Sequence, residues 1–361
     1  MLDDTLLGDP AALAALDLGG VLRAAATAGA QVRAAAAGAL DAGISDLTGL
    51  RPRALVLLRR PGASSTAAGL LAAVLGEPCP VPVVTADRVP SWIGPLDVMV
   101  AHTADPTDVE LAESVAFAVR RGAEVVLSAP AEGPVASAGA GRVRLVEPRI
   151  PVPPGLDLSG ALAVGLVTAS VLRLFDDPPD PALESLADVL DAEAERNQPG
   201  HEPFMNPAKS LALRLADHTP LLWGTDPLAV AVAEHAAGAL ATHAGVVAHA
   251  SDIARAATAA GLVRALDRGG ERDVFHDPFD DPQEAQATVR LVLLGTGEDD
   301  PGTVALRRTG RDRSAVDVVH PVDEVARGTR HAALLRAGLL ASRFDVAAVY
   351  LGLATRMIAA T

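Results

Sequence analysis

The stretch Ala54-Leu-Val-Leu-Leu58 is a short apolar run that leads into the glycine-containing turn Pro61-Gly-Ala-Ser-Ser65. A buried strand followed by such a turn and then an apolar helix is typical of the start of a βαβ unit. Further short apolar runs follow in the first half of the chain, at 81–85, 96–101, 124–128 and 143–146. Strands that alternate with helices predict a mostly parallel sheet with helices on both faces.

The residues before this strand are rich in alanine and predict helix. Over 10–43, apolar residues such as Leu13 and Val32 recur roughly at helical spacing. Gly19–Gly20 and Gly29 interrupt the pattern, because glycine is a poor helix former. We therefore expect this segment to break into two helices.

The alternation restarts in the second half of the chain, after a proline-rich break at 175–181 and a polar helix that ends near Asn197. Asn206-Pro-Ala-Lys209 is expected to open a helix, because Asn is favoured at the N-cap and Pro at the first helical position. The strands expected after it lie at 220–224, 246–249, 289–294 and 315–319. The helices expected in this half lie at 227–240, 322–340 and 345–359.

The two runs of alternating elements predict an α/β protein with two doubly wound parallel-sheet lobes and flanking helices. The expected organisation is an N-terminal helical segment over 1–50, a first lobe over 51–175, a helical connection over 176–218 and a second lobe over 219–361.

The composition of the chain restricts its core residues and argues against some classes of binding partner. Half of the 361 residues are hydrophobic and only 2% are aromatic, so the cores must consist of Ala, Val and Leu. The formal net charge of −15 argues against nucleic acid and against anionic membranes, because both repel an acidic protein.

The cellular compartment is predicted from three features. Cys79 is the single cysteine, which excludes an internal disulfide and a metal site built from cysteines. The first ten residues carry acidic side chains where a signal peptide needs basic ones. The apolar run at 160–172 is shorter than the roughly 20 residues of a membrane span, so we interpret it as a buried helix. A cytoplasmic protein is expected.

Three motifs occur in a characteristic order. Glu147-Pro-Arg149 precedes the apolar helix at 159–172, Asn206-Pro-Ala-Lys-Ser-Leu-Ala212 is followed by Pro220-Leu-Leu-Trp-Gly224, and Val349-Tyr-Leu-Gly-Leu353 lies near the end. With these motifs the chain resembles the bifunctional phosphoglucose/phosphomannose isomerases of the SIS superfamily. More narrowly, it is similar to their divergent actinobacterial TobH-type branch. The resemblance implies two SIS-type α/β/α lobes, a homodimer, and a sugar phosphate or another carbohydrate derivative as ligand.

The resemblance implies a phosphate cradle in the loops after the first and third strands. In the first loop, Ser64, Ser65 and Thr66 are the candidate ligand-binding residues, with helix capping alone as the alternative. In the second loop, the family's Ser-x-Ser-Gly-Asn-Thr is replaced by His102-Thr-Ala-Asp-Pro-Thr107, which retains Thr107. Asp105 and the following Asp108 would repel a phosphate.

Arg149 matches the family's arginine that faces the phosphosugar, and it is the remaining candidate for substrate binding; a salt bridge with Glu147 is the alternative.

The acid–base residues implied by the resemblance are replaced as well. Thr242 stands where the family has its base glutamate, and Gly245 stands where it has a lysine. His243 and His249 remain as candidate catalytic bases, because histidine titrates near neutral pH. The alternative is that both histidines are structural.

One acidic segment suggests a metal site. His276, Asp277, Asp280 and Asp281 could hold a divalent ion, whereas the competing interpretation is an ordinary acidic turn around Pro278. We favour the turn, and we expect no metal and no cofactor.

The sequence therefore favours a carbohydrate-binding SIS protein with a degenerate, weakly catalytic or non-catalytic isomerase site. An active isomerase that uses His249 or His243 is the alternative, and a metal-dependent enzyme around His276 is a third hypothesis.

Overall fold

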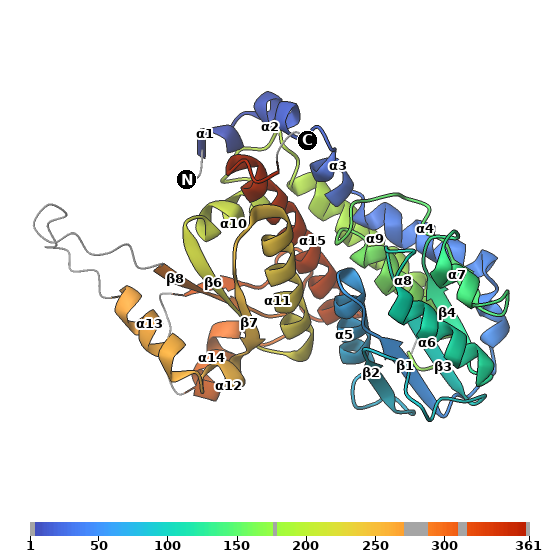
Figure 1. Cartoon of the computed structure of the whole chain (residues 1–361). Coiled ribbons are helices and arrows are strands. Elements are labelled where there is room, and N and C mark those ends of the chain that lie inside the picture. Colours follow the sequence, from blue (N-terminus) through green and yellow to red (C-terminus); the bar gives the residue numbers. More distant parts are fainter. Residues whose placement is uncertain (1–3, 176–178, 271–287, 310–315, 359–361) are drawn as a thin grey trace, which may run out of the picture. The chain divides into compact units, whose positions relative to one another are not determined.

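A computed structural model describes residues 4–175, 179–270, 288–309 and 316–358, and Figure 1 shows their secondary structure. The chain forms two compact units. The first lobe is Arg23–Ala194, and the second lobe consists of Met1–Leu22 together with Glu195–Thr361. Each lobe contains one sheet of parallel strands, so the predicted α/β class with two parallel-sheet lobes is confirmed.

The sheet of the first lobe has the strand order β2-β1-β3-β4-β5. Its strands are β1 (Ala54–Leu58), β2 (Val83–Ala86), β3 (Asp97–His102), β4 (Glu124–Ser128) and β5 (Arg144–Val146). All four neighbouring pairs are parallel. Because β2 and β3 lie on opposite sides of β1, the direction of winding reverses between β1 and β3. Open parallel sheets bind ligands at the carboxyl ends of the strands beside such a reversal.

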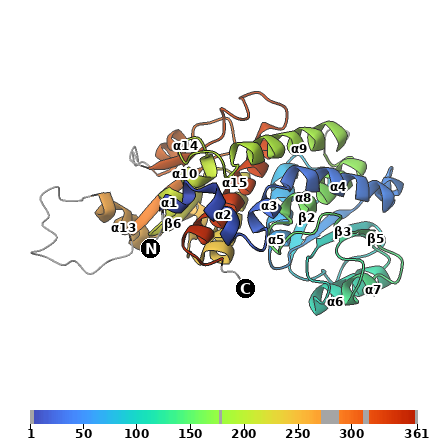
Figure 2. The same ribbon diagram turned by 90° about the horizontal axis from the view of Figure 1, so that it is seen from above.

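Helices cover both faces of this sheet. Figure 2 shows α4 and α8 on one side of it and α6 and α7 on the other. The helices of this lobe are α4 (Ala28–Asp41), α5 (Ala63–Leu75), α6 (Val109–Arg120), α7 (Pro134–Ala138), α8 (Leu158–Val171) and α9 (Pro179–Arg196), with a 3₁₀ turn η1 (Ile44–Leu47). The short helix α3 (Val21–Ala25) spans the sequence boundary between the two units.

The strands are apolar along their whole length because both of their faces are covered. All five residues of β1 are buried, and Val56 and Leu58 pack with Val115 of α6 in the core of the lobe. Helix α8 is buried over most of its length, which confirms the interpretation of this apolar run as a core helix.

Gly29 does not break the N-terminal helix as predicted, since it lies inside α4. A Cβ atom at this position would lie 2.6 Å from the carbonyl oxygen of Ala187 in α9. The prediction was wrong because this glycine permits two helices to approach closely and does not end one of them.

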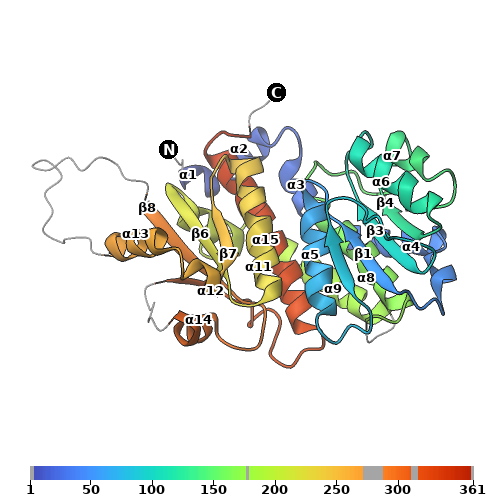
Figure 3. The same cartoon turned by 60° about the horizontal axis from the view of Figure 1, so that its bottom comes forward.

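The sheet of the second lobe has the strand order β7-β6-β8-β9, and its neighbours are again parallel. Its strands are β6 (His218–Gly224), β7 (His249–Asp252), β8 (Thr288–Leu294) and β9 (Asp317–Val319). Its helices are α1 (Asp4–Leu7), α2 (Pro10–Leu16), α10 (Pro207–Leu215), α11 (Pro227–Ala239), α12 (Ile253–Ala256), α13 (Ala260–Gly270), α14 (Pro301–Thr309) and α15 (Ala332–Ala354), with a π-helical turn η2 (Leu240–Ala244). Figure 3 shows α11 and α15 side by side next to this sheet.

Two predictions about this lobe were wrong. The strand expected at 246–249 begins at His249 and runs to Asp252. The two helices expected at the end of the chain are one helix, α15. Its charged residues do not mark a break, because Arg343 forms an ion pair with Glu324 and Asp345 forms a hydrogen bond with His235.

Helix α15 is long and apolar enough to cross a membrane, but all of its most apolar 18-residue window is buried inside the protein. It is therefore the core helix of the second lobe.

The Asn206–Lys209 motif joins α10 to the turn before it. The Asn206 side chain accepts a hydrogen bond from the Lys209 backbone N–H at 2.9 Å, as the predicted N-cap requires. The buried Lys209 ammonium donates to the carbonyl oxygens of Pro199 and His201 at 2.7 and 2.8 Å, and burial lowers its pKa. The Tyr350 hydroxyl donates to the carbonyl oxygen of Asn197 at 2.7 Å. The motif therefore holds the start of α10 and the preceding turn together, and we call it the Asn206–Lys209 clamp.

Helix α15 approaches η2 so closely that a methyl group at Gly352 would collide with the carbonyl oxygen of His243. We predict that Gly352→Ala lowers the free energy of unfolding by about 3 kcal/mol, because a well-packed core resists added atoms. Gly238→Ala is the matched control. Its methyl group would enter open space on α11 and should stabilise the protein by about 0.5–1 kcal/mol. Urea denaturation measures both, and equal midpoints for the two variants would contradict the expectation.

Candidate functional site

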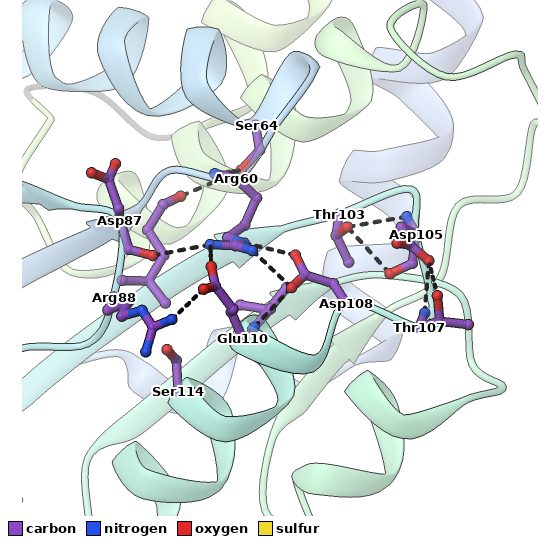
Figure 4. Close-up of polar contacts among 12 residues, drawn as sticks. Arg60, Ser64, Asp87, Arg88, Thr103, Asp105, Thr107, Asp108, Glu110 and Ser114 are labelled. Atoms are coloured by element: carbon purple, nitrogen blue, oxygen red, sulfur yellow. Dashed lines mark hydrogen bonds and ion pairs between the residues drawn. The ribbon is translucent and has the colours of Figure 1, made fainter.

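Arg60 occupies the carboxyl edge of the first sheet, where the loops after β1 and β3 meet (Figure 4). Its guanidinium forms two parallel hydrogen bonds with the carboxylate of Asp108, from Nε to Oδ2 at 2.7 Å and from Nη2 to Oδ1 at 2.8 Å. The two side chains are each only 10% exposed. Such a bidentate, nearly buried pair has a fixed geometry.

The electrostatics of the pair keep Asp108 ionised. Burial alone would raise the pKa of Asp108, but the hydrogen bond and charge of Arg60 outweigh it, so the pKa lies below its usual value. The same carboxylate accepts the backbone N–H of Leu111 at 3.0 Å and caps α6. Arg60 also bonds Glu110 at 3.0 Å, and Glu110 pairs with Arg88.

The hydroxyl groups predicted to bind a ligand lie around this ion pair, but several already have partners. Ser64 is buried in the first turn of α5; its hydroxyl donates to the Leu58 carbonyl oxygen at 3.3 Å and accepts the Arg60 N–H at 3.2 Å. Thr107 donates its hydroxyl and its backbone N–H to Asp105 at 2.7 and 2.8 Å. In the same first turn of α5, Ser65 is exposed and Thr66 is buried.

The corresponding edge of the second sheet is occupied in a similar way. Asp226 caps α11, and its carboxylate also accepts the Thr296 backbone N–H at 2.8 Å, the Thr296 hydroxyl at 2.6 Å and the Gly297 N–H at 3.3 Å. The buried Arg336 donates to the carbonyl oxygens of Thr296 and Gly297. A cavity of about 490 Å³ lies beside this loop, with Asp299 and Arg307 in its wall.

The two candidate catalytic histidines are in different surroundings. His249 is exposed and begins β7, at the amino end of an edge strand. His243 is buried in the π-helical turn η2. Burial lowers its pKa, Asp345 opposes this effect and His235 adds to it, so the ring is neutral at neutral pH.

Arg149 lies in the wall of a separate cavity of about 220 Å³ in the first lobe. Its guanidinium forms an ion pair with Asp41 of α4, and not with Glu147 as the alternative interpretation had it. The side chain is 47% exposed, so it remains accessible from solvent.

A polar cluster that was not predicted from the sequence lies in the wall of the same cavity. His102 ends β3, Ser128 ends β4 beside it in register, and Asp157 precedes α8. His102 Nδ1 lies 3.0 Å from the Ser128 hydroxyl, and Nε2 lies 2.6 Å from a carboxylate oxygen of Asp157. One signal was available: His102 directly follows the strand predicted at 96–101, and Ser128 ends the strand predicted at 124–128, so both polar residues belong to the strand ends where ligands bind.

The acidic segment at 274–281 lies outside the described residues. Within the ranges that the structure describes, no group of three or more His, Cys, Asp or Glu side chains could hold a metal ion.

Residues 204–357 match the family model described as bacterial phospho-glucose isomerase C-terminal SIS domain. This segment coincides with most of the second lobe, from the Asn206–Lys209 clamp to the end of α15. No protein with a curated description matches the chain.

Solved structures match both lobes together. A protein of Silicibacter pomeroyi with a provisional description as a phosphosugar isomerase is 17% identical, with a TM-score of 0.60 over 93% of this chain and 98% of its own. One of Clostridium difficile, described in the same way, is 9% identical, with a TM-score of 0.62 over 92% of both chains. The C-terminal domain of glucosamine-fructose-6-phosphate aminotransferase from Francisella tularensis is 11% identical, with a TM-score of 0.56 over 90% and 94%. The chain therefore has a SIS-like fold with two parallel sheets.

The Arg60–Asp108 pair yields a stability prediction. Arg60→Met leaves a nearly buried carboxylate unpaired and should lower the free energy of unfolding by about 3 kcal/mol. Adding Asp108→Asn removes that charge but keeps an N-cap side chain, so the double variant should regain part of the loss. Urea unfolding of the wild type, both single variants and the double variant measures the coupling. Losses that simply add would contradict it.

The buried His243 predicts a pH dependence of stability. Its pKa is lowered in the folded protein, so below about pH 6.5 the unfolded chain binds the proton more strongly. The contribution of His243 to the free energy of unfolding is therefore present above that pH and is lost as the pH falls. His243→Gln should flatten the decline in stability between pH 7.5 and 5.5, measured by urea denaturation. His201→Gln changes an exposed histidine and should leave the slope as it is.

Proposed function

We propose that this protein binds a carbohydrate derivative on a SIS-type scaffold whose isomerase site is degenerate, so that it turns over phosphosugars weakly or not at all. The observation that carries the proposal is the Arg60–Asp108 ion pair at the edge of the first sheet. It occupies the position between β1 and β3 where a parallel sheet of this kind receives its ligand.

The groups that would hold a phosphate already form hydrogen bonds with other residues of the chain. The Asp105 carboxylate accepts hydrogen bonds from both the hydroxyl and the backbone N–H of Thr107, and the nearly buried Asp108 adds a negative charge to the loop. A phosphate about 4 Å from an ionised carboxylate is opposed by several kcal/mol. Arg60 does not relieve this repulsion, because its donors already bind Asp108, Glu110 and the backbone of Asp87.

The ligand-binding residues that we propose are Ser64, Ser65 and Thr66 at the start of α5, with Thr107 and Arg149. Ser65, Thr107 and Arg149 are the exposed residues among them. A ligand without a phosphate suits these groups best, because neutral hydroxyls meet no repulsion from Asp105 or Asp108.

Two assays test the proposal on the purified protein. Glucose 6-phosphate and mannose 6-phosphate should show no turnover approaching about 1 s⁻¹, the lower end of ordinary enzyme rates. A thermal-shift screen of unphosphorylated sugars, sugar phosphates and sugar nucleotides should find a stabilising ligand, because binding to the native state raises stability. Ser65→Ala with Arg149→Met should weaken that shift, and the exposed Ser137→Ala of α7 is the matched control. Ordinary turnover of either phosphosugar would refute the proposal.

An active isomerase with a rebuilt site is the alternative, with His249 or His243 as the base. It has less support, since His249 begins its strand while ligands of parallel sheets bind at the opposite edge. It predicts that His249→Ala or His243→Ala abolishes an isomerase activity.

We further infer, from the motifs and the acidic composition, that the chain is a cytoplasmic homodimer of the actinobacterial TobH-type branch.

A further inference from the structure

The His102 ring is held between two polar partners in a nearly buried position. Its Nε2 lies 2.6 Å from Asp157 Oδ2 and its Nδ1 lies 3.0 Å from Ser128 Oγ. Burial raises the pKa of Asp157, but its interaction with His102 and the hydrogen bonds from backbone N–H groups together lower it below its usual value, so the carboxylate is ionised. Asp157 also accepts the Gly155 N–H at 3.1 Å, which fixes the orientation of the carboxylate.

This arrangement determines which ring nitrogen carries the proton. An ionised carboxylate accepts only, so Nε2 donates to Asp157; in the neutral ring the lone pair of Nδ1 then faces the Ser128 hydroxyl. A hydroxyl, a base and a group that orients the base are the parts of an activated nucleophile. His102 and Ser128 are side by side because both end neighbouring strands in register.

All three residues line the cavity of about 220 Å³ in the first lobe. Gly160, in the first turn of α8, lines it too, and the Asp157 side chain does not cap that helix; the Ala161 N–H already donates to the Asp157 carbonyl oxygen at 3.1 Å. The backbone N–H groups of a first helical turn stabilise negative charge. The remaining wall includes the apolar side chains Ala34, Ala35, Val146, Ile150, Val152 and Val164.

The charges and the volume of the cavity indicate the chemical class of the substrate. Asp157 and Glu147 in its wall oppose a dianionic phosphate, and Arg149 in the same wall is already paired with Asp41, whereas a neutral ester meets no such repulsion. Its volume, below the roughly 300–1,000 Å³ of a drug-sized pocket, suits a small acyl group such as acetyl.

We propose that Ser128, His102 and Asp157 form a hydrolytic site for small neutral acyl esters in the first lobe, in the cavity whose wall also holds Arg149. Ser128 Oγ forms a bond to the acyl carbon while His102 Nδ1 takes the hydroxyl proton. The bond from the acyl carbon to the ester oxygen then breaks, and Nδ1 returns the proton to the departing alcohol.

Water completes the cycle. Its oxygen bonds to the acyl carbon of the acyl-serine while one proton passes to His102 Nδ1. The bond to Ser128 Oγ breaks and Oγ regains that proton, which leaves a carboxylic acid. The N–H groups of the first turn of α8 stabilise the oxyanion in both halves, and Asp157 stabilises the charged imidazole.

The test uses the full chain and two probes. Diisopropyl fluorophosphate should phosphorylate Ser128, as its Oγ–P bond forms and fluoride leaves, and peptide mass spectrometry locates the adduct. p-Nitrophenyl acetate should release nitrophenolate at a rate that Ser128→Ala reduces to background. Ser137→Ala, which removes an exposed serine of the same lobe, should leave both reactions unchanged.

Asp157→Asn is the decisive variant. Its Oδ1 can still accept from Gly155, but its amide donates to Nε2 and forces the ring proton onto Nδ1, where it blocks the base. Both reactions should slow by at least about 100-fold, the contribution of a general base. An unchanged urea midpoint for this variant shows that the fold is retained, and His102→Gln provides a second loss of the base. Failure of both probes with the wild type, or equal rates in Asp157→Asn, would overturn the proposal.

Discussion

Carboxylates of the chain itself occupy the places at both sheet edges where a SIS-type fold would receive an anion. In the first lobe, Asp108 is locked to Arg60 while it caps α6. In the second lobe, Asp226 collects the N–H groups of Thr296 and Gly297 while it caps α11. Each carboxylate thus joins a loop to a helix through hydrogen bonds within the chain. An anion would have to displace an internal partner before it could bind.

The first-lobe strands were predictable because burial on both faces leaves an unbroken apolar run, as in Ala54–Leu58. The errors arose where tertiary contacts override local signals. Gly29 belongs to a helix because α9 packs against it, and α15 continues through Ser342 and Arg343 because partners from other segments satisfy its buried charges. The predicted position of β7 was wrong by three residues, which matters more for the site, because His249 lies at the beginning of the observed strand and not at its end.

The candidate site was predictable in residue type and less so in geometry. The sequence marks Asp105 and Asp108 as foreign to a phosphate cradle, and the structure shows both engaged in internal bonds. That Arg60 binds Asp108 depends on a loop contact over 48 residues, which no local pattern encodes. The cluster of His102, Ser128 and Asp157 is a mixed case. The sequence places His102 just after one predicted strand and Ser128 at the end of another, whereas Asp157 reaches them only through the packing of α8.

The clamp around Lys209 bears on how such chains are recognised in genomes. Its asparagine closes a helix end, and its lysine ties down a turn through two carbonyl oxygens, so its residues serve the architecture of the lobe. A chain that abandoned turnover would still need this clamp in order to fold. A sequence search that uses this motif therefore finds proteins with the same fold, whether or not they are active isomerases. The number of matches in a genome does not measure how many isomerases the organism has.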